Sequence, residues 1–148
     1  TDPRLVGRYY EKADRYTKFR VFEKKAPAKE KVVERIDLSL SDGEAAALAF
    51  EGYLEIKRPG WYRFEVATEY FRHIGNQFFT LTLDDAEVFR NAWYRDADGK
   101  MRQAGVVRLE PGTYALHAET LIKKPGMEFL WEGPGIEQQP VPAEVLSH

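Results

Sequence analysis

The chain has 148 residues, a length that favours one domain with a core of its own. Hydrophobic residues make up 43% and charged residues 31%, proportions typical of folded proteins and not of disordered ones. Cysteine is absent, which excludes disulfide scaffolds, cysteine-based zinc sites and thiol catalysis. No apolar run approaches the length of a membrane-spanning helix, so we expect no membrane partner.

The net charge of −2 conceals an asymmetry along the chain. Residues 1–36 carry 11 Lys/Arg and 6 Asp/Glu, whereas residues 37–148 carry 11 and 18. The basic residues are scattered among acidic ones, so we expect them to be solvated or to contact the acidic remainder, and not to bind nucleic acid. The alternative is a basic arm that contacts a polyanionic glycan. The chain opens with Thr1 and shows no signal-like apolar region, so we expect an excised or processed piece.

The first third of the chain predicts strands separated by a less regular segment. Val6–Tyr10 is a short apolar and aromatic strand, and residues 11–31 show little pattern. The period-two spacing of Ile36, Leu38 and Leu40 is typical of a strand. Residues 44–56 begin with an alanine-rich run that favours helix, but they continue into strand alternation, and we predict a strand throughout.

From residue 58 onward, short alternating segments lie between Gly, Pro and Asp turns. Tyr62, Phe64 and Val66 share one face of the segment 61–66. Further strands are predicted near residues 79–83, 106–109, 114–118 and 129–131, with turns at 58–60, 84–85, 96–99, 111–112 and 123–126. No βαβ rhythm occurs, so the chain predicts an all-β fold, an antiparallel β-sandwich or barrel.

The order of several segments resembles one known family. They are Gly7–Tyr10, Phe50–Ile56, Pro59–Phe64, Leu81–Asp85, Leu109–Tyr114, Leu130–Ile136 and Gln139–Pro142. Together they resemble the protective-antigen-type β domain found in bacterial toxins, glycosidases, yeast adhesins and bacterial surface proteins. The resemblance implies a single domain over residues 1–148, with the best-matching core at 46–145 and an N-terminal strand and basic extension at 1–45.

The family's calcium loop differs in this chain. In carbohydrate-binding members, two adjacent aspartates after the aromatic strand hold a calcium ion that binds sugar hydroxyls. The corresponding residues 68–77 lack the aspartate pair. They contain a single acid, Glu69, and a cation, Arg72. We therefore expect no metal and no cofactor, and predict direct ligand contacts, because amides, Arg and aromatic faces also bind sugars. The predicted ligand-binding residues are Glu69, Tyr70, Arg72, His73, Asn76, Gln77, Trp93 and Tyr94. For Trp93, packing beneath its own hairpin is the equal alternative.

Other acidic pairs have simpler interpretations. Asp84-Asp85 follows a predicted strand, where aspartates favour a hairpin turn by local hydrogen bonding. Asp96 and Asp98 resemble the start of a calcium loop, but no bidentate Glu follows at the required spacing. No G-x-S-x-G motif and no metal-spaced histidines occur, so we expect no catalytic residues and no enzyme activity.

These observations predict a non-catalytic carbohydrate-binding accessory module of a larger bacterial extracellular or periplasmic protein. Its expected partners are a glycan or cell-surface polysaccharide and other domains of the parent protein. The alternative is a structural, spacer or protein-interaction domain without a sugar site. The two differ in that a sugar-binding domain needs polar groups beside exposed aromatic rings, whereas a spacer needs only apolar patches.

Removal of calcium is expected to leave the melting temperature unchanged, because the aspartate pair is missing. A calcium site filled at about 100 times its Kd would stabilise the fold by about 2.7 kcal/mol, which shifts the melting temperature measurably. Thermal unfolding with EDTA and with added calcium measures this. A rise of several degrees with calcium would contradict the prediction and direct attention to Asp84, Asp85, Asp96 and Asp98.

Overall fold

The computed structural model describes residues 2–10, 26–41, 46–69, 78–89, 92–122 and 126–148. One set of strands comprises β1 (Leu5–Tyr10), β2 (Lys29–Val33), β3 (Ala46–Ile56), β5 (Phe78–Leu83), β6 (Ala86–Glu87), β9 (Gly112–Ile122) and β12 (Leu146–Ser147). A second set comprises β4 (Gly60–Glu69), β7 (Tyr94–Arg95), β8 (Lys100–Leu109), β10 (Glu128–Gly133) and β11 (Ile136–Pro140). Two short 3₁₀ turns, η2 (Ser39–Ser41) and η4 (Ala143–Val145), complete the described elements.

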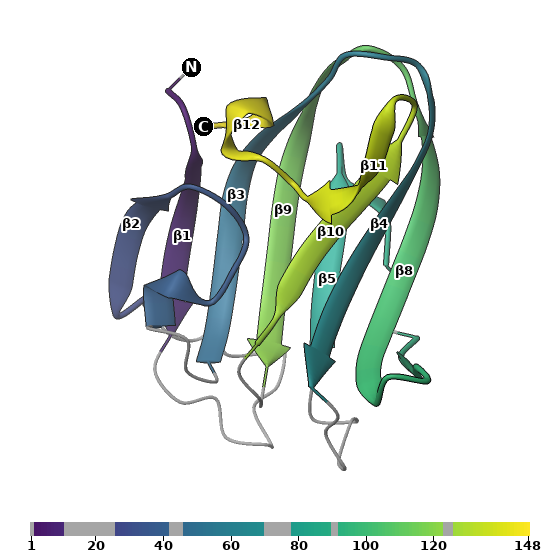
Figure 1. The fold of residues 1–148 in the computed structure, drawn as a ribbon. Helices are drawn as coiled ribbons and strands as arrows, with labels where there is room; N and C mark the ends of the chain where they lie inside the picture. Colours follow the sequence, from purple (N-terminus) through teal and green to yellow (C-terminus); the bar gives the residue numbers. More distant parts are fainter. Residues whose placement is uncertain (1, 11–25, 42–45, 70–77, 90–91, 123–125) are drawn as a thin grey trace.

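The two sets form two antiparallel sheets packed face to face (Figure 1). In the described part of the chain, the larger sheet has seven strands in the order β2-β1-β3-β9-β5-β6, with β12 paired to β3. The smaller sheet has five, in the order β11-β10-β4-β8-β7. The predicted all-β antiparallel fold is thus confirmed as a sandwich, and the described strands close no barrel. No helix in these ranges is long and apolar enough to cross a membrane.

Strand alternation places the core between the sheets. Tyr62, Phe64 and Val66 are all buried on the inner face of β4, as their spacing predicts. Phe79 of β5 stacks on Phe129 of β10, with ring centroids 5.6 Å apart and an interplanar angle of 16°. The two rings come from different sheets, so this contact joins the layers.

Two predictions for the N-terminal third are wrong in detail. The predicted strand at Ile36–Leu40 is a series of bends followed by η2, although Ile36, Leu38 and Leu40 are all buried in the main core. Residues 29–31 belong to the stretch 11–31 that shows little pattern in the sequence, yet they form most of the edge strand β2 beside β1. Only Val33 of β2 is buried, so the apolar alternation that would reveal a strand is absent. Residues 42–45 and 123–125 of the predicted segments lie outside the described residues.

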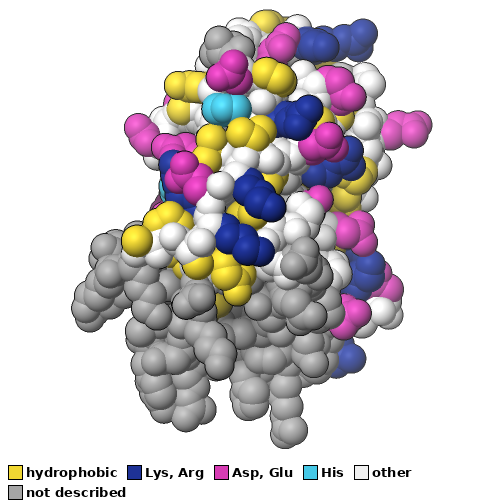
Figure 2. Space-filling model, turned by 90° about the vertical axis from the view of Figure 1, so that its left-hand side faces the viewer, with side chains coloured by type: hydrophobic (Ala, Val, Ile, Leu, Met, Phe, Trp, Pro, Cys, Tyr) yellow, Lys and Arg dark blue, Asp and Glu magenta, His cyan; other side chains and the backbone are white. Residues whose placement is uncertain are grey.

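The β1–β2 side of the sandwich carries intermixed charges. Figure 2 shows basic and acidic side chains alternating over this side, without one continuous basic patch. Arg8 of β1 illustrates the arrangement, because its guanidinium binds Glu30 of β2 at 2.9 Å and Glu51 of β3 at 2.8 Å. This basic residue contacts acidic neighbours, in agreement with the charge pattern of the sequence.

Gly52 is required where β12 meets β3. A Cβ atom at this position would lie 2.2 Å from the carbonyl oxygen of Ser147 and 2.6 Å from a methyl carbon of Leu5. Since the nearest obstacle is backbone, it cannot turn aside as a side chain can. Glycine here therefore lets the end of the chain pack against the sheet.

We expect Gly52→Ala to lower the free energy of unfolding by about 1–3 kcal/mol, the usual cost of overpacking. Gly7→Ala is the matched comparison, since its Cβ would meet only side-chain atoms of Val33 and Leu40, at 3.1 Å or more. Urea unfolding of both variants measures the difference. Equal losses in the two variants would contradict the steric role assigned to Ser147.

Candidate functional site

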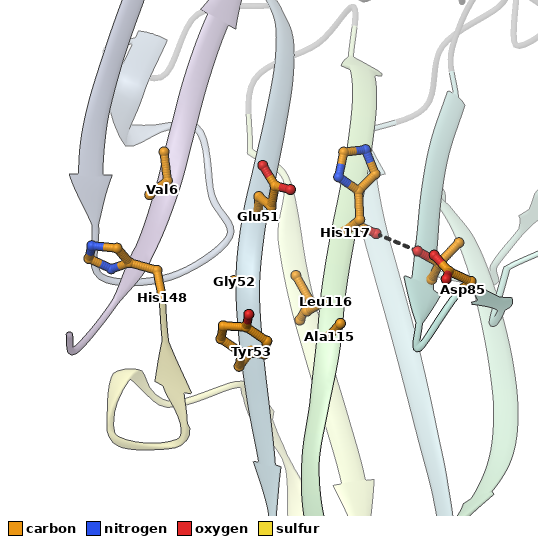
Figure 3. Close-up of a pocket in the computed structure, with 10 residues that line it drawn as sticks. Val6, Glu51, Gly52, Tyr53, Asp85, Ala115, Leu116, His117 and His148 are labelled. Carbon is orange, nitrogen blue, oxygen red and sulfur yellow. Dashed lines mark hydrogen bonds between the residues drawn. The ribbon is translucent and has the colours of Figure 1, made fainter. Parts of the chain in front are cut away.

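A hollow of about 380 Å³ lies on the outer face of the larger sheet (Figure 3). The antiparallel register places its central side chains in one row across four neighbouring strands, β1, β3, β9 and β5. This row consists of Val6, Glu51, His117 and Thr82. Tyr53, Asp85, Ala115 and His148 line the hollow beside it, with Gly52 and Leu116 of the sheet beneath.

Two side chains of the hollow are available to a ligand. Tyr53 is 40% exposed, and its hydroxyl group has no hydrogen-bond partner among the described residues. Asp85 is exposed in the β5–β6 turn and likewise binds no other side chain of the described ranges. Its neighbour Asp84 instead accepts the backbone N–H of Ala115 at 2.7 Å. Both aspartates have positive φ, so the pair forms a hairpin turn, as predicted from the sequence.

The charges around the hollow are arranged in pairs. Glu51 is held by Arg8, and the hydrogen bonds from this guanidinium to Glu51 and Glu30 raise the pKa of Arg8. His117 Nε2 lies 2.8 Å from Glu119 Oε1. That hydrogen bond raises the pKa of His117 above its ordinary value of 6.5, although partial burial opposes the shift. A carboxylate and an imidazole whose protonated form it favours therefore lie side by side.

This set of groups is suited to a hydroxyl-rich ligand. Carboxylates accept hydrogen bonds, imidazole and phenol groups both donate and accept them, and an aromatic ring offers an apolar face. No serine nucleophile accompanies His117 in the hollow. In the described ranges, no three His, Asp or Glu side chains are grouped so that they could hold a metal ion.

A second polar cluster covers the outer face of the smaller sheet, and its centre is the buried carboxylate of Glu65. Arg63 binds one carboxylate oxygen at 2.9 Å and Arg102 binds the other at 3.0 Å. Gln138 donates to Glu65 at 3.1 Å, and the hydroxyl group of Tyr94 donates at 3.5 Å. Because these partners come from β4, β8, β11 and β7, the cluster joins four of the five strands.

The acids of the β7–β8 turn are also engaged. Arg102 binds Asp96 at 2.7 Å and Asp98 at 2.9 Å. Asp98 also accepts the backbone N–H of Lys100, and this hydrogen bond keeps the pKa of its carboxyl group below the ordinary value. A cation bound here would have to compete with the guanidinium group already in place. The contacts therefore favour a turn stabilised by Arg102 over a calcium loop.

The predicted ligand-binding residues are only partly described. Glu69 is exposed at the end of β4, and Tyr94 lies two strands away at the same end of the smaller sheet, since their partners on β8 are Lys100 and Arg102. Trp93 is partly buried and packs against the main core. The predicted residues Tyr70, Arg72, His73, Asn76 and Gln77 lie outside the described residues.

The sequence predictions did not include the hollow on the larger sheet. Its residues are far apart along the chain and meet only through strand pairing. One local signal was available, because Glu51 and Tyr53 occupy the outward positions of the alternating segment 50–56.

The fold was compared with known proteins. No protein-family model and no curated protein matches the sequence. Among solved structures, an anti-sigma factor domain-containing protein from Clostridium clariflavum is similar with a TM-score of 0.69 and 16% identity, over 99% of this chain and 48% of that one. This chain therefore spans about half of that protein.

Two PA14 domains, the protective-antigen type, are similar over nearly their whole lengths. The PA14 sugar-binding domain from an RTX adhesin has a TM-score of 0.69 and 15% identity, over 100% of this chain and 99% of that one. The PA14 domain of the MpAFP antifreeze protein has a TM-score of 0.68 and 13% identity, over 97% and 89%. The chain thus has the fold of PA14 domains, as the sequence resemblance implied.

We expect Glu119→Gln to lower the pKa of His117 towards 6.5, because it replaces a charged acceptor that favours the imidazolium form by a neutral one. Since the folded-state pKa is raised, the stabilisation from this pair is complete below pH 6.5 and is lost as pH rises through the folded-state pKa. An NMR titration of the His117 ring protons measures the shift. Glu110→Gln, an exposed acid that pairs with Arg108, is the control. An identical His117 pKa in wild type and Glu119→Gln would contradict the assignment.

Proposed function

We propose that this chain is a non-catalytic carbohydrate-binding module, an accessory domain of a larger bacterial extracellular or periplasmic protein. The observation that carries the proposal is the mutual full-length similarity to a PA14 domain described as sugar-binding. In this proposal residues 1–148 form a single domain, and glycan or cell-surface polysaccharide is the ligand. Binding requires no calcium, in keeping with the missing aspartate pair and with the engagement of Asp96 and Asp98 by Arg102.

The hollow on the larger sheet is the proposed primary contact. Its volume of about 380 Å³ lies within the range of small-ligand sites, roughly 300–1,000 Å³. Tyr53 supplies an exposed ring for stacking on a pyranose, and Glu51, Asp85 and His117 supply hydrogen-bonding groups around it. The residues Glu69 to Gln77 predicted from the sequence are a second proposed contact, and of these the structure describes Glu69, the last residue of β4.

A protein-interaction or spacer role is the second candidate function. The similarity to an anti-sigma factor domain-containing protein favours it, since that match concerns a protein whose description names no sugar. Under this alternative the two outer-face polar clusters serve stability, and no glycan binds.

A glycan array with and without calcium is the direct test. We expect binding to at least one glycan that calcium does not alter, and Tyr53→Ala to weaken it about tenfold or more, the loss expected for one stacked aromatic contact of roughly 1–3 kcal/mol. Trp61→Ala is the matched control, an exposed aromatic on the opposite sheet. Both variants are expected to keep the wild-type melting temperature.

The loop contact is tested separately with Tyr70→Ala. If Tyr70→Ala weakens binding and Tyr53→Ala does not, the primary contact is the segment Glu69 to Gln77 and not the hollow. Absence of binding to every glycan on the array would contradict the sugar-binding proposal and favour the spacer role.

A further inference from the structure

A second cavity, of about 300 Å³, lies at the end of the sandwich where the β3–β4 and β10–β11 turns approach the C-terminal η4 segment. This is the upper end in Figure 1. Its walls are mainly apolar and its rim is polar. The apolar residues are Tyr62, Trp131, Pro134, Ile136, Pro142 and Val145, and the polar residues are Glu55, Lys57, Arg58 and Gln139.

The floor of this cavity is rigid. Tyr62 and Trp131 are almost fully buried, and their ring centroids lie 5.8 Å apart. The Tyr62 hydroxyl group donates to the backbone carbonyl of Arg58 at 2.7 Å, which holds the β3–β4 turn against the rings. A Cβ atom at Gly133 would lie 2.5 Å from the Tyr62 ring, so glycine is needed for this close packing.

Glycine also lets the two turns meet at the rim. Gly60 contacts the ring of Pro134, where a Cβ would lie 2.5 Å away. Gly135 has a φ of +70°, and a Cβ there would lie 2.4 Å from Nη1 of Arg58. The Arg58 side chain therefore lies directly over the glycine of the β10–β11 turn.

The rim has available positive charge. Lys57 and Arg58 are exposed, and neither forms an ion pair with any residue that the structure describes. By contrast, Arg8, Arg63 and Arg102 on the sheet faces are each bound to carboxylates. One acid, Glu55, also lines the cavity, so the lining residues carry a net charge of +1. This balance favours an anion over a neutral ligand.

We propose that this cavity binds a sugar ring that bears a carboxylate, such as a hexuronate. The planar Arg58 guanidinium matches a carboxylate in bidentate geometry, and Lys57 adds a second positive charge. The apolar walls contact the C–H face of the ring. Glu55 accepts hydrogen bonds from the hydroxyl groups of the sugar, and the Gln139 amide both donates to them and accepts from them. An inorganic anion would leave these apolar walls without a partner. The site is separate from the hollow on the larger sheet.

The test is titration of the full chain with sodium glucuronate, followed by the NMR signals of the three tryptophan indoles, Trp61, Trp93 and Trp131. Glucose, acetate and inorganic phosphate are the comparison probes. We expect glucuronate to shift the Trp131 indole signal and to bind about tenfold or more tightly than any of the other three. If glucose shifts the Trp131 signal as much as glucuronate does, the carboxylate is not recognised. If acetate or phosphate shifts it as much, the sugar ring is not recognised. Either result, or no shift with glucuronate, would overturn the proposal.

Three variants test the named residues. Arg58→Gln removes the charge from an exposed side chain and is expected to weaken glucuronate binding about tenfold to a hundredfold, the loss typical of a hydrogen bond to a charged group. Lys57→Gln, expected to weaken it less, provides a second variant if Arg58→Gln alters the turn. Arg108→Gln is the control, an exposed arginine on the smaller sheet that pairs with Glu110. Equal affinity in Arg58→Gln, Lys57→Gln and Arg108→Gln would overturn the assignment. Since Tyr53→Ala lies outside this cavity, unchanged glucuronate binding in that variant separates this proposal from the primary glycan contact.

Discussion

The aromatic contact between the sheets is the interaction on which the remaining structure depends. Phe79 of the larger sheet stacks on Phe129 of the smaller one, and Phe89 meets both rings edge to face at 5.6 Å and 6.4 Å. Each such pair contributes about 0.5–1.5 kcal/mol beyond the burial of its area. Because these rings must face inward, the alternation of side chains also determines which other residues of β5 and β10 face the core and which face solvent.

The outer surfaces follow from this inner constraint. With alternate residues committed to the core, Glu51, His117 and Thr82 must face outward from adjacent strands, and register brings them into one row. The same rule directs Glu65 outward on the smaller sheet, where Arg63 and Arg102 cover it. Both polar surfaces are therefore consequences of how the core is packed, although they differ in availability to a ligand.

The availability of its polar groups to a ligand separates a binding surface from a stabilising one. Around Glu65 the strong donors are already used, and removal of either arginine would leave a buried charge with fewer partners. In the hollow on the larger sheet, Tyr53 and Asp85 keep unused hydrogen-bonding capacity towards solvent. The cavity at the end of the sandwich combines apolar walls with Lys57 and Arg58, which form no ion pair with any residue in the described ranges. A ligand gains most where groups are held in position but not yet bonded.

The sequence alone determined the fold class and the inward faces of the regular strands, because alternation and turn chemistry are local properties. Tyr62, Phe64 and Val66 were placed correctly for this reason, and so was the Asp84-Asp85 turn. The strand β2 was missed because an exposed edge strand needs no apolar alternation. Only the tertiary structure decided the burial of Glu65, whose partners Arg102 and Gln138 are 37 and 73 residues away. The two cavities were equally hidden, since their lining residues meet only when separate strands and turns pair in space, and no local pattern records that pairing.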